Sequence, residues 1–187
     1  LMRMEDGALG LFYLSRVGWD DLRLKLRRSY DEGETFSEAV DCMDAPRYYV
    51  VNNDRVVRLS SGRIIVPAAL RDTTYRRNEA GELIKGFDGR AADVFFLSDD
   101  DGRSFRQARG KVQMGHLKHS DSGLQEPGII ELKNGVLWCW ARTDLGRQYE
   151  MFSMDGGETW TEDYVIHPNV PFCDHGYPAT VELKDGS

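Results

Sequence analysis

The stretch Ser29-Tyr30-Asp31-Glu32-Gly33-Glu34-Thr35-Phe36 contains a turn motif that recurs at Ser98–Phe105 and at Ser153–Trp160. All three copies follow the pattern Ser-x-Asp-x-Gly-x-(Thr/Ser)-(Phe/Trp), and three such eight-residue matches are far beyond chance. Asp accepts hydrogen bonds from the amides of its own turn, Gly supplies a positive φ, and the closing aromatic packs back on a sheet. Each copy therefore predicts a tight turn between two strands. The residues expected to build these turns are Ser29, Asp31, Gly33, Phe36, Ser98, Asp100, Gly102, Phe105, Ser153, Asp155, Gly157 and Trp160.

A second motif alternates with the first and consists of an apolar-x-Leu/Met stretch followed by a short turn that ends in Gly. It occurs at Met2–Gly7, Val57–Gly62, Ile130–Gly135 and Val181–Gly186. Asp-Gly and Asn-Gly pairs between apolar runs of period two are the strongest short-range hairpin signal. The chain is therefore expected to alternate four hairpins with three of the Asp-containing turns.

The spacing of the hairpin glycines predicts the architecture. They lie 55, 73 and 51 residues apart, which is close to or above the roughly 40 to 50 residues of a four-stranded propeller blade. We therefore predict an all-β fold with almost no helix, namely a β-propeller of which this chain covers about three to four blades. The approximate blades are 1–47, 48–120, 121–170 and an incomplete 171–187, and the remaining blades are expected outside this chain.

Two further stretches carry structural predictions. The long second interval contains the polar insert Arg71–Arg90, which we expect to be a long loop on one face, where propellers tend to place binding residues. The basic run Arg23–Arg28 alternates with leucines, so it predicts a half-exposed strand and not a phosphate-binding patch.

Composition excludes several classes of partner. The chain has 24 basic and 31 acidic residues and a net charge of -7, which opposes binding to nucleic acid and to anionic membrane surfaces. The chain contains no run of about 18 apolar residues, so the sequence predicts no membrane-spanning helix. The three cysteines form no CxxC pair, Asp99–Asp101 lacks the ligand spacing of an EF-hand, and His116 and His119 lack a third ligand. We therefore predict no metal site.

The three Asp turns on a blade-length repeat resemble the BNR/Asp-box sialidase (neuraminidase) superfamily over essentially the whole chain. The match is closer to the broader sialidase-related BNR-repeat proteins, and the resemblance implies a propeller of the six-bladed sialidase type. Leu124–Arg142 resembles the sialidase segment in which a Glu opens an inner strand and an Arg closes the next. The resemblance implies that Glu126 assists a catalytic Tyr and that Arg142 is one of three arginines holding the substrate carboxylate.

The position of these two residues also follows from the hairpin itself. Glu126 and Arg142 are centred on the turn residue Asn134, so they are expected to be cross-strand neighbours at one end of a hairpin. A simple cross-strand ion pair is the alternative interpretation. Sialic acid carries a carboxylate on its anomeric carbon, so a neutral Tyr is a better nucleophile than a carboxylate. A nearby Glu can take the phenol proton, and guanidinium groups bind the substrate carboxylate bidentately. This mechanism needs no metal or organic cofactor.

Other candidates lie at equivalent positions of neighbouring hairpins. Counting nine residues back from the hairpin glycines gives Asn53, Glu126 and Tyr177, which are expected near the propeller axis. Asp54 is a candidate general acid and Arg55 a second anion contact, although turn capping or a salt bridge explains both equally well. The full candidate set is Glu126, Asp54 and Tyr177 for catalysis, with Arg142, Arg55, Asn53, Gln125 and His175 for substrate binding.

The sequence also departs from the family at some positions. The Arg-Ile-Pro motif that supplies the first substrate-binding Arg is absent, since Arg63–Pro67 lies inside a predicted strand. The third Arg and the nucleophilic Tyr are expected beyond Ser187, and Tyr177 lies one blade earlier than that nucleophile. The leading hypothesis is a sialidase-like glycoside hydrolase that removes a terminal acidic sugar from a glycan. The alternatives are a non-catalytic propeller that binds glycan or protein, and a related hydrolase or lyase acting on another sugar.

Overall fold

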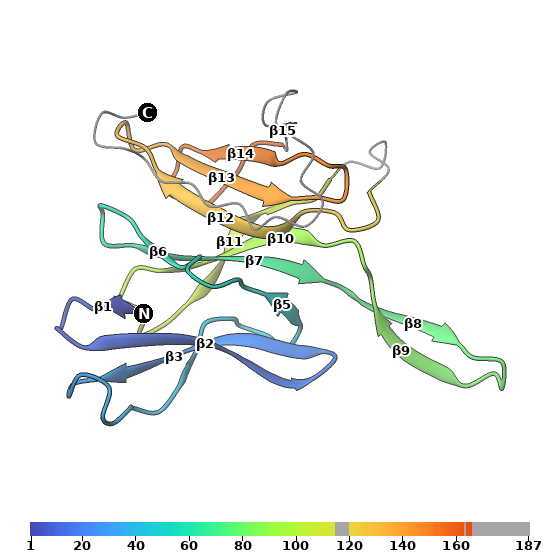
Figure 1. The fold of residues 1–187 in the computed structure, drawn as a ribbon, viewed down its shortest axis with the longest axis horizontal. Coiled ribbons are helices and arrows are strands. Elements are labelled where there is room, and N and C mark those ends of the chain that lie inside the picture. The colour runs from blue at the N-terminus through green and yellow to red at the C-terminus, as the bar shows by residue number, and fades with distance from the viewer. Residues whose placement is uncertain (115–119, 163, 166–187) are drawn as a thin grey trace.

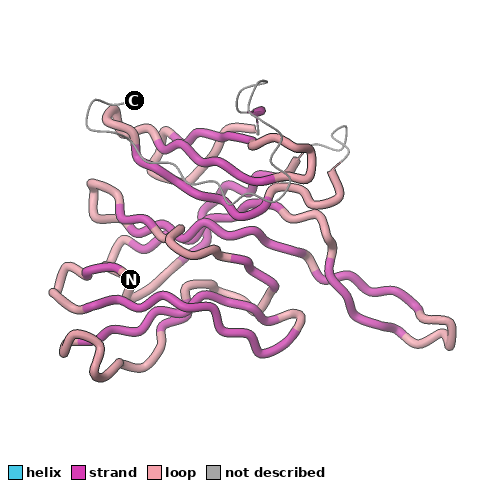
Figure 2. The backbone as a smooth tube through the Cα atoms, in the orientation of Figure 1, coloured by secondary structure: helices cyan, strands magenta, loops and turns pink. Residues whose placement is uncertain are grey.

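The computed structural model describes residues 1–114, 120–162 and 164–165, which contain strands and no helix (Figures 1 and 2). The strands form three repeat units of similar order. The first unit contains β1 (Met2–Arg3), β2 (Leu9–Gly18), β3 (Asp21–Ser29) and β4 (Val40–Asp41). The second contains β5 (Tyr48–Val50), β6 (Val57–Arg58), β7 (Ile64–Arg71), β10 (Ala92–Ser98) and β11 (Arg106–Val112). The third contains β12 (Gln125–Glu131), β13 (Leu137–Arg142), β14 (Tyr149–Ser153) and β15 (Tyr164–Val165).

Consecutive strands pair antiparallel in the first and third units, which is the pattern that successive short turns produce. In the second unit, β5 and β6 both pair antiparallel with β7, which is followed by β10 and β11. The third unit is a separate four-stranded sheet in the order β12-β13-β14-β15. The short strand β5 connects the other two units, because it pairs antiparallel with β7 and makes one parallel pairing with β3, between Leu22 and Tyr48. The described sheets do not close into a ring.

Two strands of the middle unit, β7 and β10, are buried on both faces. Residues 64–70 of β7 and all of β10 are buried, whereas β3 of the first unit alternates between buried leucines and partly exposed basic residues. In β7, Ile64 packs into a core shared with the first unit and its neighbour Ile65 packs into a core shared with the third. In β10, Phe96 and Phe95 divide between the two cores in the same way. Since successive side chains point to opposite faces of a strand, continuous apolar runs mark strands placed between two layers.

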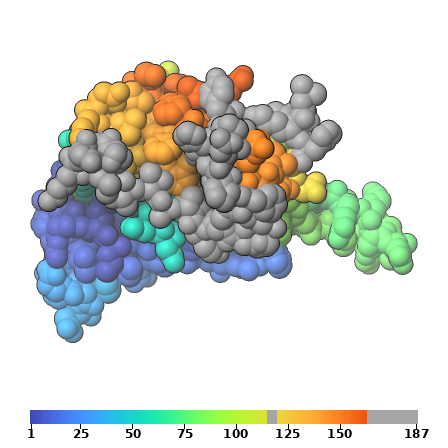
Figure 3. All heavy atoms as spheres, turned by 45° about the horizontal axis from the view of Figure 1, so that its top comes forward, coloured from blue at the N-terminus to red at the C-terminus, as the bar shows by residue number. Residues whose placement is uncertain are grey.

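The insert at Arg71–Arg90 is a hairpin and not the long loop that its polarity predicts. It contains β8 (Thr73–Arg77) and β9 (Leu83–Phe87), paired in a regular antiparallel register. Asn78 closes the turn, because its Oδ1 accepts the Glu82 amide at 2.9 Å and its carbonyl accepts the Gly81 amide at 2.9 Å. The hairpin projects beyond the three units (Figure 3). Both strands contain β-forming residues, Thr73 to Tyr75 in β8 and Ile84 and Phe87 in β9, beside charged ones. The polarity of the insert as a whole is therefore compatible with a solvent-exposed strand pair.

Each Asp-containing turn is closed by the same four hydrogen bonds. In the first copy, Ser29 Oγ donates to Asp31 Oδ1 at 2.7 Å and accepts the Gly33 amide at 2.7 Å. The Thr35 amide and hydroxyl donate to the two Asp31 carboxylate oxygens at 2.9 and 2.6 Å. The copies centred on Asp100 and Asp155 repeat these bonds, with their seventh-position hydroxyls donating at 2.6 Å. The hydroxyl at position seven is therefore as much a part of the turn as the Ser and Asp.

The closing aromatics of the three turns are packed to different degrees. Trp160 stacks on Phe95 with ring centroids 4.2 Å apart, and Phe105 packs against the core of the first and second units. Phe36 in the first unit remains 37% exposed. The three turns therefore have the same internal hydrogen bonds, but their closing aromatic residues differ in how they are packed.

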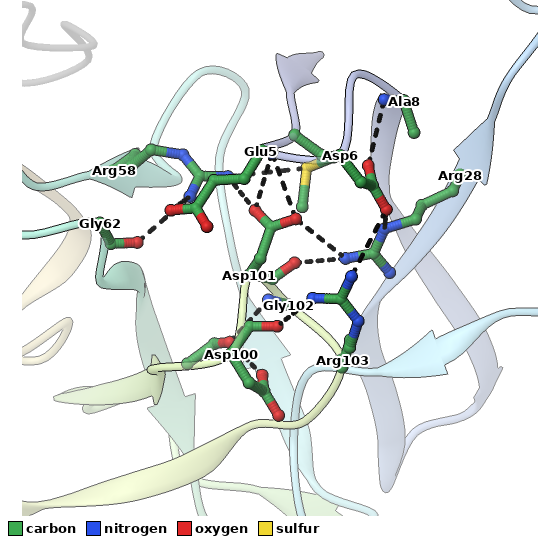
Figure 4. A network of polar contacts seen from close by, with 12 residues as sticks. Glu5, Asp6, Ala8, Arg28, Arg58, Gly62, Asp100, Asp101, Gly102 and Arg103 are labelled. Carbon is green, nitrogen blue, oxygen red and sulfur yellow. Dashed lines mark hydrogen bonds and ion pairs between the residues drawn. The ribbon is translucent and has the colours of Figure 1, made fainter.

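The turn of one unit also contacts the preceding unit. Asp101, next to Gly102 in the second turn, has a side chain only 3% exposed and accepts a hydrogen bond from Arg58 Nη2 at 2.5 Å (Figure 4). Its carboxylate also accepts the Glu5 amide, and Arg28 of the first unit donates to its carbonyl oxygen. In the third turn, the Gly156 carbonyl accepts a hydrogen bond from Arg63 of the second unit at 3.0 Å. The turns therefore join consecutive units.

The turn glycines provide a direct test of this packing. A Cβ at Gly102 would lie 2.7 Å from Leu26 Cδ2 and one at Gly157 would lie 2.8 Å from Ile65 Cδ1, whereas one at Gly33 would have only Phe36 at 4.0 Å. All three have positive φ, so alanine introduces strain of roughly 1 to 2 kcal/mol at each. We expect Gly102→Ala and Gly157→Ala to lower the free energy of unfolding by about 1 to 3 kcal/mol more than Gly33→Ala, because they also overpack a core.

Urea unfolding of the three variants measures this difference. Equal destabilisation by all three would mean that the turns do not pack tightly between units.

The hydrogen bonds inside the first turn predict a pH dependence. The Thr35 hydroxyl and amide, followed by Ser29, lower the pKa of Asp31 to about 2. A carboxyl whose pKa is depressed in the folded state adds stability above its unfolded pKa, and that stability is lost as the pH falls through the folded pKa. We expect Thr35→Val to raise the pKa of Asp31, so that the loss of this contribution begins at a higher pH. An NMR titration of the Asp31 carboxyl carbon measures the shift, and an unchanged pKa would contradict the role of the hydroxyl.

Candidate functional site

The candidate site begins at a β-bulge where β12 pairs with β13. From Glu131 to Gly128 the register is regular, and it then shifts so that Gln125 pairs with Arg142. Glu126 has a φ of 55°, a left-handed conformation that is uncommon for a residue with a side chain. Pro127 follows and has no amide to donate to a ladder, which is one reason proline inside a strand is found at bulges. The predicted backbone pairing of Glu126 with Arg142 is therefore wrong by one residue, although their side chains meet.

Glu126 and Gln125 hold the Arg142 side chain from one direction. Arg142 Nε donates to Glu126 Oε2 at 3.1 Å, and Arg142 Nη2 donates to Glu126 Oε1 at 3.1 Å and to Gln125 Oε1 at 2.5 Å. This is the fork-to-fork geometry that makes Arg–carboxylate pairs directional. The Glu126 and Arg142 side chains are 13% and 21% exposed. Arg142 Nη1 donates no hydrogen bond to a described residue, so its two N–H groups are not used within the described part of the chain.

A second arginine lies beneath this pair. Arg55 is buried, and its guanidinium carbon lies 5.6 Å from the ring centroid of Trp140, which is itself buried. A Cβ at Gly128 would lie 2.5 Å from the Trp140 ring and 3.0 Å from Arg55 Nη1. Glycine at position 128 is therefore what lets the arginine and the indole approach the β12 backbone.

The charges of the site are coupled through Arg55. Burial lowers the pKa of the Arg55 guanidinium, and the carboxylates of Glu126 and Asp54 act in the opposite direction. Arg55 therefore links two of the predicted catalytic carboxyl groups electrostatically. Since burial disfavours the charged form, these carboxylates stabilise the cation.

Asn53 and Asp54 lie on the exposed connection between β5 and β6. Asp54 has a φ of 59° and makes no ion pair with another described residue. Both side chains line a hollow of about 440 Å³ beside β2, together with apolar residues such as Leu14 and Val51. The structure therefore brings Glu126, Arg142 and Gln125 into direct contact, and places Asn53 and Asp54 at the surface beside Arg55.

Two predicted site residues, His175 and Tyr177, lie outside the described residues. Sequence reasoning missed Gly128 and the role of Trp140 as the support for Arg55. The Glu-Pro-Gly sequence at 126–128 was the available signal for the bulge, because Pro and Gly inside a strand pattern both indicate one.

The described residues contain no group of three or more His, Cys, Asp or Glu side chains placed to hold a metal ion. The two described cysteines, Cys42 and Cys139, are buried and unpaired, and burial raises the pKa of both thiols. The described residues contain no helix that is long and apolar enough to cross a membrane.

The family model for the BNR repeat-like domain matches residues 1–187. The chain belongs to the BNR repeat-like family. This membership confirms the predicted relation to the BNR-repeat proteins. A search of curated proteins gives no match.

Solved structures show the same fold over most of this BNR repeat-like chain. A Hadza microbial sialidase aligns with a TM-score of 0.58 and 18% identity, covering 83% of this chain and 30% of its own. The intramolecular trans-sialidase from Ruminococcus gnavus aligns with a TM-score of 0.52 and 19% identity, covering 89% and 36%. A protein of unknown function from Dyadobacter fermentans gives 0.54 and 16%, covering 88% and 49%. The chain thus spans half or less of the length of these proteins.

Proposed function

We propose that this BNR repeat-like chain is part of a six-bladed propeller and that the whole protein is a sialidase-like glycoside hydrolase acting on a terminal acidic sugar. The three repeat units are the proposed blades, approximately 1–47, 48–120 and 121–170, with 171–187 beginning a fourth. The observation that carries the proposal is the Arg142 side chain, oriented by Glu126 and Gln125 with Nη1 left without a described partner. Family membership and the fold of the sialidase neighbours support it.

In this proposal Arg142 binds the carboxylate of the sugar. The hydrogen bonds to Glu126 and Gln125 restrict the Arg142 side chain. Less side-chain entropy is therefore lost when the substrate binds. Arg55 adds a positive charge beside the site, and Asn53 and Gln125 are proposed to contact the sugar. His175, which lies outside the described residues, is a further proposed contact. Binding through a planar, permanently charged group suits an anionic sugar better than a neutral one.

Glu126 has a second proposed role as the group that accepts a proton from a nucleophilic tyrosine. Tyr177, which lies one blade earlier than the expected nucleophile, is proposed to line the pocket, and Asp54 is the candidate general acid for the leaving group. A neutral phenol avoids the charge repulsion that a carboxylate would meet beside the substrate carboxylate. A covalent intermediate formed in this way gives retention of anomeric configuration.

The bidentate Glu126–Arg142 contact also supports a second candidate function. An ion pair that is complete without a ligand is compatible with a non-catalytic propeller that binds a glycan or a protein through the same face. This candidate predicts binding without turnover. A hydrolase or lyase acting on another sugar is a third candidate, and substrate testing distinguishes it.

The release of a fluorogenic aglycone from an α-sialoside by the full-length protein tests the proposal. We expect Glu126→Gln to lower kcat by about 10²-fold or more, because proton transfer by a positioned side chain contributes roughly this much. Arg142→Lys keeps the charge but loses the two-pronged geometry, so we expect it mainly to raise KM.

Arg106→Ala is the matched control, because Arg106 also pairs with a carboxylate, Glu158 in the third Asp-containing turn. Unchanged turnover in both site variants would refute the assignment. Binding of the sialoside without turnover in the wild type would favour the binding module.

A further inference from the structure

Three aromatic rings from separate segments gather where the β2–β3 turn meets the base of the β8–β9 hairpin. Tyr48 in β5 and Phe87 in β9 have ring centroids 5.3 Å apart and planes inclined by 5°. Trp19 in the turn lies 5.7 Å from Phe87 and 6.4 Å from Tyr48, inclined by 21° and 17°. Trp19 is nevertheless 60% exposed. Large exposed aromatic surfaces of this kind are enriched at binding sites.

Basic side chains surround these rings. The Arg16 guanidinium carbon lies 4.2 Å from the centroid of Trp19, and that of Arg71 lies 5.4 Å from the centroid of Phe87. Lys85 pairs with Asp20 in the same turn. Arg76 is exposed and makes no hydrogen bond or ion pair with a described residue. A cationic cluster is notable in a chain whose net charge is -7.

The aromatic and basic groups enclose a hollow. It has a volume of about 360 Å³ and is lined by Trp19, Thr74, Arg76, Lys85, Gly86 and Phe87. Its size is at the lower end of the roughly 300 to 1,000 Å³ that is typical of small-molecule sites. Its lining combines ring surface with hydrogen-bond donors. Its two charged residues are Arg76 and Lys85, and Lys85 is paired with Asp20.

The hollow lies on the same side of the molecule as the Glu126–Arg142 pair. Strands β2, β7 and β13 run in the same direction, so their C-terminal ends lie together (Figure 1). The β2–β3 turn follows the first of these ends, the β8–β9 hairpin follows the second, and Arg142 is the last residue of the third. The Asp-containing turns lie at the opposite ends of the sheets.

We propose that this hollow, the Trp19 hollow, binds an anionic sugar ring of a glycan chain at a subsite separate from Arg142. The apolar C–H face of a pyranose packs on aromatic surface, and the carboxylate or sulfate of the sugar pairs with Arg76. Guanidinium donors match such groups well. The inference rests on the proposed function for the nature of the ligand, and it assigns a second contact to the remainder of the glycan.

Isothermal titration calorimetry with a chondroitin sulfate tetrasaccharide, which carries both carboxylates and sulfates, tests the proposal on the full-length protein. We expect Arg76→Ala to weaken binding about tenfold because it removes one charge-assisted contact. We expect Trp19→Ala to weaken binding by about the same factor because it removes aromatic surface that packs on the sugar. We also expect neutral maltotetraose to bind at least tenfold more weakly than the acidic probe.

Two nearby residues provide matched controls. Tyr75 is as exposed as Trp19 but does not line the hollow, and Arg77 is the neighbour of Arg76 whose Nη1 donates to the Gly81 carbonyl. Tyr75→Ala and Arg77→Ala are expected to leave the affinity unchanged. Trp19→Phe keeps an aromatic ring and is expected to retain most of the affinity.

The outcomes separate this inference from the proposed function. Binding of the tetrasaccharide that survives Arg142→Ala but not Trp19→Ala supports the Trp19 hollow, whether or not the protein cleaves a sialoside. Sialoside turnover without tetrasaccharide binding overturns the inference and leaves the proposed function standing. The inference would also be overturned if the control variants lost as much affinity as Trp19→Ala, or if the neutral sugar bound as tightly as the acidic probe. A change in self-association as the only effect of Trp19→Ala would overturn it as well.

Discussion

The carboxylate of each Asp-containing turn forms hydrogen bonds with a Ser hydroxyl on one side and with a hydroxyl and an amide on the other. This closure gives the turn two consecutive residues with positive φ, such as Asp101 and Gly102. The shape places Gly102 against Leu26 and Gly157 against Ile65, in each case a residue of the preceding unit. The stacking of units, and therefore the two apolar cores between them, depends on this local arrangement.

The buried Asp101 shows how polar groups are accommodated at such a contact. A carboxylate that is only 3% exposed requires compensation, and it receives Arg58 and the Glu5 amide. Arg28 adds a hydrogen bond to the neighbouring carbonyl. The first and second units therefore share a polar network beside an apolar core (Figure 4). Such a network favours one relative position of the units, because displacement would leave buried charges without partners.

The two ends of the sheets have different roles in this arrangement. The Asp-containing turns and the hairpin turns that end in Gly7, Gly62 and Gly135 lie at one end, where contacts of the Asp-containing turns join consecutive units. The other end contains the β-bulge at Glu126, the connection at Asn53 and Asp54, and the long β8–β9 hairpin. Irregular backbone at this end places polar and aromatic side chains at the surface, while the regular strands bury the apolar side chains of the core. The candidate site and the Trp19 hollow both lie there.

Sequence alone predicted the Asp-containing turns, their alternation with hairpins, and the family, because hydrogen bonds within eight residues and apolar alternation are local properties. It also predicted that Glu126 meets Arg142, since both lie at equal distance from Asn134. The tertiary structure decided the bulge that shifts their register, the hairpin within the insert, and the position of Arg55 on Trp140 beside Gly128. It alone brought Trp19, Tyr48 and Phe87 together from three segments. These features depend on packing between residues far apart in the chain, and no local pattern in a single sequence records which of those residues will touch.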